Sequence, residues 1–134
     1  MSCALCESSP DLVFENAAGR VLLHPDSAVA GHAMVVAARH VENLSDLEPD
    51  EVREFASLQH AAERALLDVT RTERAILLKL GITTPHLHVH IYPVRNTMSR
   101  EEVMKVIDAE VREVRMEGFG EAVRERIERL TSTT

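Results

Sequence analysis

The stretch Pro85-His86-Leu87-His88-Val89-His90-Ile91-Tyr92-Pro93 alternates three histidines with three aliphatic residues. Alternation with a period of two predicts a β-strand that is buried on one face. We expect Leu87, Val89 and Ile91 to face the core, so that the imidazoles share the other face; a slip of one residue would reverse the two sets. Three of the seven histidines fall on this face, which favours a functional site over a surface strand with three solvated histidines.

The length of 134 residues predicts one domain, spanning residues 1–134, that buries its own core. No stretch approaches the roughly 18 apolar residues of a membrane span, so we expect a cytoplasmic protein without a membrane partner. Cys3 and Cys6 form a C-x-x-C motif. In a reducing compartment this spacing favours metal binding or redox chemistry over a structural disulfide, with free thiols in hydrogen-bonded turns as the alternative.

The formal net charge of −7 argues against a nonspecific nucleic-acid binder, because neutralising phosphates requires a surplus of lysine and arginine. The distribution of charge is uneven. Residues 71–100 contain five lysines and arginines but only one carboxylate, Glu73. This segment is expected to attract a small anionic ligand, unless its cations are simply solvated on one face.

The remaining hydrophobic patterns predict an α+β domain with an antiparallel sheet of about five strands, arranged as a meander with one long inserted helix. Residues 1–98 form the core, and residues 99–134 form a C-terminal helical extension whose last helix packs on the core or on a partner subunit. Besides the histidine strand, strands are expected over residues 12–16, 20–24, 33–38 and 74–80, and helices over residues 49–69, 99–115 and 119–130.

The spacing of the three histidines limits how a metal ion can use them. Along a strand, the Cα atoms of His86 and His90 lie about 13 Å apart, whereas zinc needs each nitrogen within about 2.0–2.1 Å. One ion can therefore bind adjacent histidines but not all three. Further ligands are available in Cys3, Cys6 and His40. This suggests that one end of the array is structural and the rest catalytic.

His88 is the natural nucleophile of the array. A neutral imidazole, with an ordinary pKa near 6.5, attacks phosphorus at neutral pH, and a neighbouring imidazolium stabilises phosphate charge or protonates a leaving oxygen. His88 is flanked by a histidine on each side of the strand face, and it lies in the basic segment.

At these residues the sequence resembles the histidine triad (HIT) superfamily, whose signature is His-φ-His-φ-His-φ-φ with φ apolar. The signature stands here at residues 86–92. The resemblance covers roughly residues 3–95 and includes the C-x-x-C motif, the Gly31-His32 entry to an apolar strand, the stretch over residues 39–44 and the inserted helix. As a combination this match is specific.

The resemblance implies a HIT-like fold, a homodimer, and a nucleotide-binding hydrolase or nucleotidyl transferase. Such proteins cleave at the α-phosphorus of a dinucleoside polyphosphate or nucleoside phosphoramidate, which implies a covalent nucleotidyl-histidine intermediate on His88. His90 would contact the phosphate, and His32 would lie at the same site. Members with C-x-x-C resemble zinc binders, which implies a structural Zn²⁺ held by four residues. These are Cys3, Cys6, His40 and His86.

Two departures from the family pattern concern substrate binding. Many members bind the ribose with an acidic residue where this chain has His24, with Asp26 two residues on. Lys79 stands near the position of a common asparagine, and the phosphate loop contains Thr83 and Thr84. We expect Asp26, Lys79, Thr83 and Thr84 to take over the substrate contacts.

Three functions are compatible with these residues. The first is the enzyme with His88 as its nucleophile. The second is a non-catalytic nucleotide-binding or regulatory HIT module, which the two departures favour. The third is a hydrolase whose metal is itself catalytic. His24 and His60 are interpreted as structural or surface groups.

Overall fold

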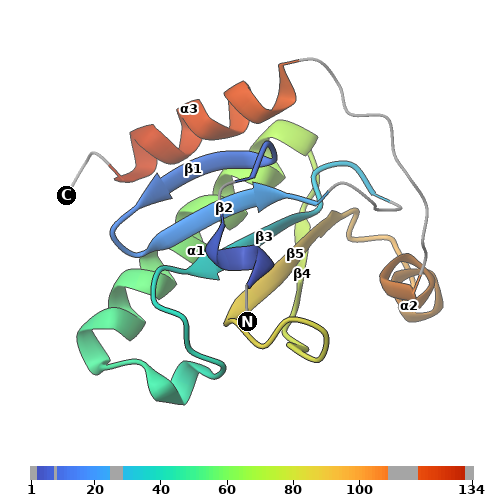
Figure 1. The fold of residues 1–134 in the computed structure, drawn as a ribbon. Coiled ribbons are helices and arrows are strands. Elements are labelled where there is room, and N and C mark those ends of the chain that lie inside the picture. Colours follow the sequence, from blue (N-terminus) through green and yellow to red (C-terminus); the bar gives the residue numbers. More distant parts are fainter. Residues whose placement is uncertain (1–2, 8, 25–28, 109–117, 132–134) are drawn as a thin grey trace.

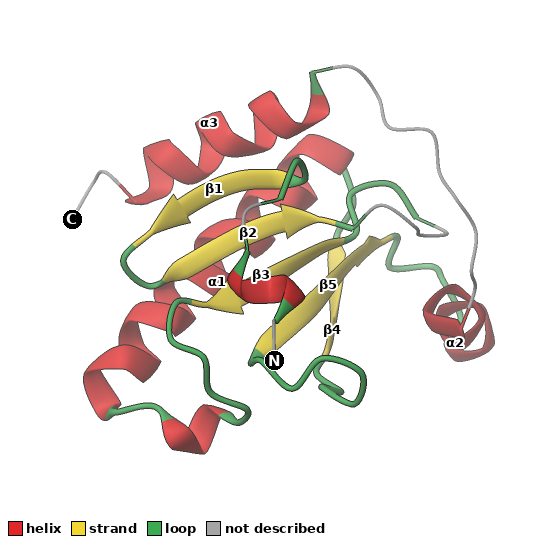
Figure 2. Ribbon diagram, viewed as in Figure 1, coloured by secondary structure: helices red, strands yellow, loops and turns green. Residues whose placement is uncertain are grey.

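The computed structural model describes residues 3–7, 9–24, 29–108 and 118–131. They form one five-stranded sheet with helices on one side and at its ends (Figure 1 and Figure 2). The α+β class and the antiparallel sheet are therefore confirmed. The elements are η1 (Ala4–Cys6), β1 (Leu12–Asn16), β2 (Gly19–Leu23), β3 (Ala33–Ala37), η2 (Leu44–Asp46), α1 (Pro49–Thr70), β4 (Arg74–Leu78), β5 (His88–Val94), α2 (Arg100–Asp108) and α3 (Phe119–Thr131).

The strand order is β1-β2-β3-β5-β4, and every neighbouring pair is antiparallel. This differs from the predicted meander, because β5 lies between β3 and β4. The long helix α1 carries the chain from β3 to the edge strand β4, and the chain then returns through β5. Because β5 lies inside the sheet, this histidine strand is hydrogen-bonded to a neighbouring strand on both sides. It also allows the aliphatic residues of that strand to pack in the core, as Ile91 does at 0% exposure.

The helix α1 covers the face of the sheet opposite the histidines. Its buried side chains recur at helical spacing, as in Phe55, Leu58, Ala62 and Leu66. Pro49 in the first turn starts the helix, which agrees with the predicted beginning. The buried face of α1 packs on aliphatic residues of β2, β3 and β5 to form the main core.

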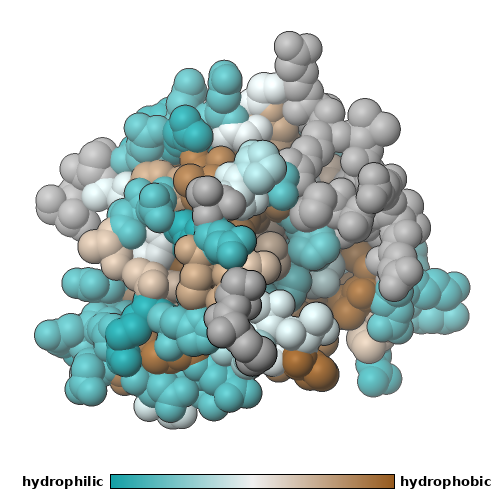
Figure 3. Space-filling model, viewed as in Figure 1, coloured by the Kyte–Doolittle hydropathy of each residue, from teal (hydrophilic) through white to brown (hydrophobic). Residues whose placement is uncertain are grey.

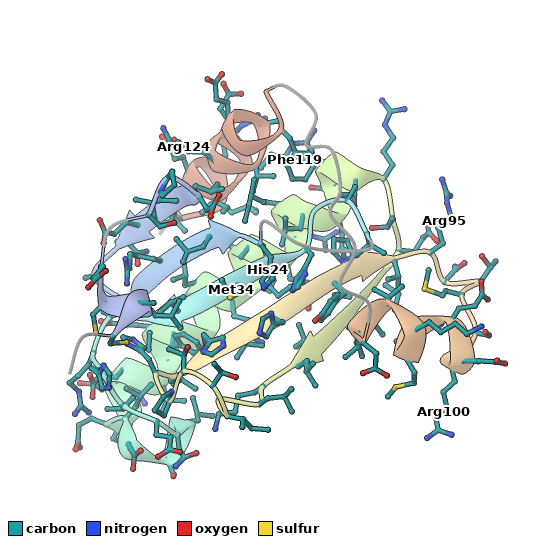
Figure 4. All side chains as sticks on the ribbon, turned by 45° about the vertical axis from the view of Figure 1, so that its right-hand side comes forward. His24, Met34, Arg95, Arg100, Phe119 and Arg124 are labelled. Atoms are coloured by element: carbon teal, nitrogen blue, oxygen red, sulfur yellow. The ribbon has the colours of Figure 1, made fainter. Side chains whose placement is uncertain are left out.

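The terminal helix α3 packs on the core of the same chain. Phe119, Val123 and Ile127 are buried in the main core, beside α1 and β1. The Arg124 Nε donates a hydrogen bond to the Val13 carbonyl at 2.7 Å, which ties α3 to β1 (Figure 4). The last helix was predicted to pack on the core or on a partner subunit, and in the structure it packs on the core.

The helix α2 projects from the end of β5 and buries none of its described residues (Figure 1). The predicted capping box is present, because the Ser99 amide donates to the Glu102 carboxylate and the Glu102 amide donates to the Ser99 hydroxyl. Residues 109–115 of the predicted helix lie outside the described residues. None of the described helices is both long and apolar enough to cross a membrane.

Candidate active site and metal centre

The strand β5 presents His88 and His90 on the sheet face turned away from α1. Val36 on β3 is the cross-strand partner of His88, and Met34 is the partner of His90. Residues directly opposite one another in an antiparallel pair point to the same face, so all four share this face. Ile91 follows His90 in the strand and points to the opposite face, into the core. The predicted division of the strand into two faces is confirmed.

The first histidine of the motif lies outside the strand. β5 begins at His88, and His86 stands in the bend before it. The backbone there is still held, because the Leu87 amide donates to the Val41 carbonyl at 2.6 Å. His86 is only 1% exposed and His88 only 8% exposed, so a strand with three solvated histidines does not describe this chain.

The first group of side chains, which we call the Cys–His cluster, consists of Cys3, Cys6, His40 and His86. One ligand atom from each residue lies within 4.8 Å of the others. The Cys6 Sγ is 3.1 Å from His40 Nδ1 and 3.4 Å from His86 Nδ1, and the Cys3 Sγ is 3.5 Å from His86 Nδ1. The short helix η1 brings the two thiols to the end of β3 and the start of β5.

The Cys–His cluster suits a zinc ion. Zinc–sulfur bonds of about 2.3 Å and zinc–nitrogen bonds of about 2.0–2.1 Å in a tetrahedron place sulfur and nitrogen ligands about 3.6 Å apart. The observed separations of 3.1–3.5 Å approach that value. The His86 Nε2 donates to the Ala37 carbonyl at 2.7 Å, which leaves the Nδ1 lone pair directed at the thiols. Burial lowers the pKa of His86, so its ligand form dominates at neutral pH.

The predicted nucleophile His88 is held by its neighbour in the motif. Its Nδ1 donates a hydrogen bond of 2.6 Å to the His86 carbonyl, in a buried position. A proton fixed on Nδ1 leaves the Nε2 lone pair available for chemistry. The ring of His90 lies 5.1 Å from that of His88, centroid to centroid, at 69°. One residue, His86, thus offers its side chain to the Cys–His cluster and its carbonyl to His88.

The second group, which we call the three-histidine cluster, consists of His24, His32 and His90. Their nearest ligand nitrogens all lie within 4.8 Å of one another. His32 Nε2 and His90 Nδ1 are 2.9 Å apart and share a hydrogen. The His24 ring stacks on the His32 ring at 4.4 Å and 7°, and His32 stacks on Tyr92 at 4.0 Å. Figure 4 shows His24 at the end of β2.

Both inner rings of the three-histidine cluster are neutral at pH 7. Burial is the main reason that the pKa of His32 falls to about 3, and the charges that His24 and His90 would carry lower it further. Burial also lowers the pKa of His90 to about 4, together with His88 and His24. Among the described residues, the buried Nδ1 of His32 has no hydrogen-bond partner.

Of the other predicted substrate residues, Lys79, Thr83 and Thr84 lie in the described part of the chain. The Lys79 Nζ donates to the Asn43 Oδ1 at 2.9 Å, on the exposed surface. Thr83 and Thr84 lie in the turn between β4 and β5, with Thr83 exposed. Asp26 lies outside the described residues.

Sequence reasoning missed His24 as a member of a site. The His24 amide donates to the His32 carbonyl at 2.9 Å, so the two residues are paired across β2 and β3. An alignment of the two predicted strands in antiparallel register would have placed the two imidazoles side by side.

The fold and the site define a small α+β protein in which β5 and the bend before it contribute histidines to two clusters. The family model for the HIT domain matches residues 6–97, more than half of the chain, so the protein belongs to the HIT domain family. The resemblance drawn from the sequence is therefore confirmed.

Solved structures agree with this fold. A zinc-bound histidine triad family protein from Mycobacterium smegmatis is 21% identical, with a TM-score of 0.75 and coverage of 99% of this chain and 98% of that chain. A hypothetical histidine triad nucleotide-binding protein from Sulfolobus tokodaii is 22% identical, with a TM-score of 0.71 and coverage of 96% and 94%. The diadenosine triphosphate hydrolase of Plasmodium falciparum is 14% identical, with a TM-score of 0.62 and coverage of 94% and 77%.

Proposed function

We propose that this protein is a nucleotide hydrolase or nucleotidyl transferase that uses His88 as its nucleophile. The observation that carries the proposal is the 2.6 Å hydrogen bond from His88 Nδ1 to the His86 carbonyl, which frees Nε2 for attack. The similar fold of a diadenosine triphosphate hydrolase and of a nucleotide-binding protein supports a nucleotide substrate.

In the proposed reaction, His88 Nε2 attacks the α-phosphorus of a dinucleoside polyphosphate or nucleoside phosphoramidate. The bond from phosphorus to the leaving oxygen or nitrogen breaks, and the nucleotide stays on the histidine. Water or another acceptor then attacks the phosphorus, and the phosphorus–nitrogen bond to His88 breaks. An anhydride leaving group departs as an anion, whereas an amine leaving group must take up a proton from solvent or substrate.

His90 and His32 are assigned to the phosphate. Both rings are neutral at pH 7, so each carries one N–H. The hydrogen bond between His32 Nε2 and His90 Nδ1 uses one of these two N–H groups, and the other is proposed to donate to a phosphate oxygen. The hydrogen bond that joins the two rings would orient both toward the substrate. Lys79, Thr83 and Thr84 remain proposed substrate contacts, as does Asp26.

The Cys–His cluster is proposed to hold a structural Zn²⁺. When bound, zinc supplies a cross-link between four ligands and no chemistry for the reaction. The cross-link would tie η1 to the sheet and hold the bend that contains His86. The zinc-bound histidine triad protein of similar fold supports this assignment. Metal analysis of protein purified without chelator should find about one zinc per chain in a site with cysteine and histidine ligands.

A homodimer formed through β4 is also proposed. This strand lies at the edge of the sheet, so one side of its backbone is unpaired within the described sheet. Leu77 in β4 is 43% exposed, and Leu80 and Ile82 in the turn after it are 57% and 83% exposed. Figure 3 shows hydrophobic residues at its lower right, where Figure 1 has the turn after β4. Light scattering of the full chain should give twice the chain mass.

We also propose that the protein is cytoplasmic.

Intact-protein mass spectrometry tests the reaction. The full chain is mixed briefly with dinucleoside polyphosphates and an adenosine phosphoramidate, and quenched without acid because phosphohistidine is acid-labile. We expect a nucleotidyl adduct on the wild type and on a His60→Ala control, and none on His88→Ala. Substrate consumption is measured in parallel, and loss of the nucleophile should lower it by at least about 10³-fold. Nucleotide binding without consumption by the wild type would instead support the non-catalytic module.

A further inference from the structure

The three-histidine cluster has the composition of a metal site as well as that of a phosphate site. Its imidazoles come from the end of β2, the start of β3 and the middle of β5. Imidazoles are ligands for borderline divalent cations such as Zn²⁺, Ni²⁺ and Cu²⁺, and they do not suit Mg²⁺ or Ca²⁺. Neither cysteine takes part.

The nitrogen positions are close to those that an ion requires. Two imidazole nitrogens at about 2.0–2.1 Å from one zinc ion lie about 3.4 Å apart in a tetrahedron. His32 Nε2 and His90 Nδ1 lie 2.9 Å apart. The ring that carries the shared hydrogen would change to its other tautomer, which moves the proton to its second nitrogen. With that change and an opening of about 0.5 Å, both facing nitrogens could bind one ion.

The third ligand, His24, would reach the ion by rotation of its side chain, without a change in the backbone. The His24 ring lies nearly parallel to the His32 ring, so in this conformation the lone pairs of the two rings do not point at one common ion position. The χ2 torsion of histidine is broad, and a turn about it redirects a His24 nitrogen toward the other two. All three nearest nitrogens are already within 4.8 Å of one another.

We propose that His24, His32 and His90 form a second, exchangeable transition-metal site, and that an ion bound there inhibits the enzyme. The ion binds His32 and His90, the two residues assigned to the substrate phosphate, so ion and nucleotide compete. The inhibition rests on the proposed function, whereas the metal binding does not. Without a thiolate, this site should bind zinc more weakly than the Cys–His cluster.

Cobalt titration of the full chain tests the site independently of activity. The first equivalent should fill the Cys–His cluster and produce a thiolate-to-cobalt charge-transfer band. The second equivalent should add visible d–d absorption without strengthening that band. His24→Asn should bind one cobalt, with the charge-transfer band intact as evidence of a folded protein. His60→Asn, which removes an exposed histidine of α1, should bind two like the wild type.

Binding of only one cobalt by the wild type, or of two by His24→Asn, would overturn the site. Turnover is then measured with one equivalent of zinc and with excess zinc. Excess zinc should inhibit the wild type and the His60 variant by at least ten-fold, reversibly by a chelator. The His24 variant, whatever its turnover with one equivalent of zinc, should show the same turnover in excess zinc. A second bound ion without inhibition would overturn the regulatory part alone. A wild type without turnover at any zinc level would contradict the proposed function, while the cobalt count would still decide the site.

Discussion

The Cys–His cluster and the three-histidine cluster lie on either side of His88, and they differ in exposure and in ligand type. The first contains two thiols, and two of its members, Cys6 and His40, are exposed. The second contains imidazoles alone, with His32 buried and the other two half-buried. The Cys–His cluster thus suits a tightly bound structural ion, and the three-histidine cluster suits an exchangeable ligand.

The sheet produces this difference by simple means. β3 and β5 run antiparallel, so the segment after β3, which contains His40, meets the segment before β5, which contains His86. The other end of β3 brings His32 to His90. The two clusters therefore use opposite ends of one strand pair, with His88 between them. A change at one end should leave the other end intact, and the following predictions test this independence.

Removal of zinc from the Cys–His cluster should have the largest effect. Its cysteines are 34 to 83 residues from its histidines in the chain, so the ion cross-links distant segments. At free zinc 1,000 times the dissociation constant, the ion adds about 4 kcal/mol to the free energy of unfolding. Urea unfolding of the full chain with zinc and with chelator should show this gap in the wild type and in His24→Asn. It should vanish in a Cys3→Ser, Cys6→Ser variant; equal stability of zinc-loaded and chelated wild type would contradict the prediction.

Gly31→Ala should damage the three-histidine cluster alone. Gly31 has a φ of +83°, and a Cβ would lie 2.7 Å from Thr70 Cγ2. The left-handed backbone costs an alanine about 1–2 kcal/mol, and the overpacking costs a further 1–3 kcal/mol. Gly118 is a matched control, since its φ is +78° and no atom of the described residues lies within 4 Å of an added Cβ.

The measurements for this pair are the free energy of unfolding, the affinity for the first zinc ion and the second cobalt equivalent. Gly31→Ala should be the less stable variant by about 1–3 kcal/mol and should lose the second cobalt, because the following residue is His32. Its affinity for the first zinc ion should equal that of the wild type. A parallel loss of both metals would show that the clusters are coupled.

Acid should destabilise the protein through the three-histidine cluster. His32 and His90 titrate near 6.5 when unfolded, but their pKa values in the fold are about 3 and about 4. Below pH 6.5 the unfolded chain therefore binds protons that the folded chain does not. Stability is full above that pH and falls as the pH drops toward 4, by up to about 1.4 kcal/mol per pH unit for each histidine.

The pH series is best measured in the chelated Cys3→Ser, Cys6→Ser background, because acid also releases zinc from thiolates. His32→Asn should flatten the slope between pH 6.5 and 4, and His60→Asn should not. An unchanged slope in the His32 variant would mean that other groups carry the acid sensitivity.

Local patterns in the sequence were sufficient for much of this architecture. The alternation of residues 86–91 correctly predicted which side chains of β5 face the core, because the period of a strand depends only on its own backbone. The long helix was predicted from Pro49 onward for a similar reason. The cysteines and His40 are indeed brought beside His86, although the identity of a bound metal remains a proposal.

The features that were missed depend on pairing between distant strands. The position of β5 between β3 and β4 follows from how α1 packs, which no local period encodes. The membership of His24 in a cluster follows from its hydrogen bond to His32 across two strands. The same limit applies to Lys79, whose charge suggested a phosphate contact but whose tertiary partner was unknown.

Lys79→Gln should have the smallest effect on the enzyme. The Nζ of Lys79 donates to Asn43 at 2.9 Å, and Asn43 lies in the loop that follows His40, at the Cys–His end of the site. Exposed charges contribute little to binding, so KM should rise by no more than about three-fold with kcat unchanged. Lys105→Gln on the exposed helix α2 removes the same charge and controls for the net charge of the protein. A rise in KM above ten-fold for Lys79→Gln alone would mean that Lys79 gives up its bond to Asn43 and makes a strong contact with the phosphate instead of a weak one. The basic residue would then connect the two ends of the site, and the independence of the two clusters would fail in the substrate complex.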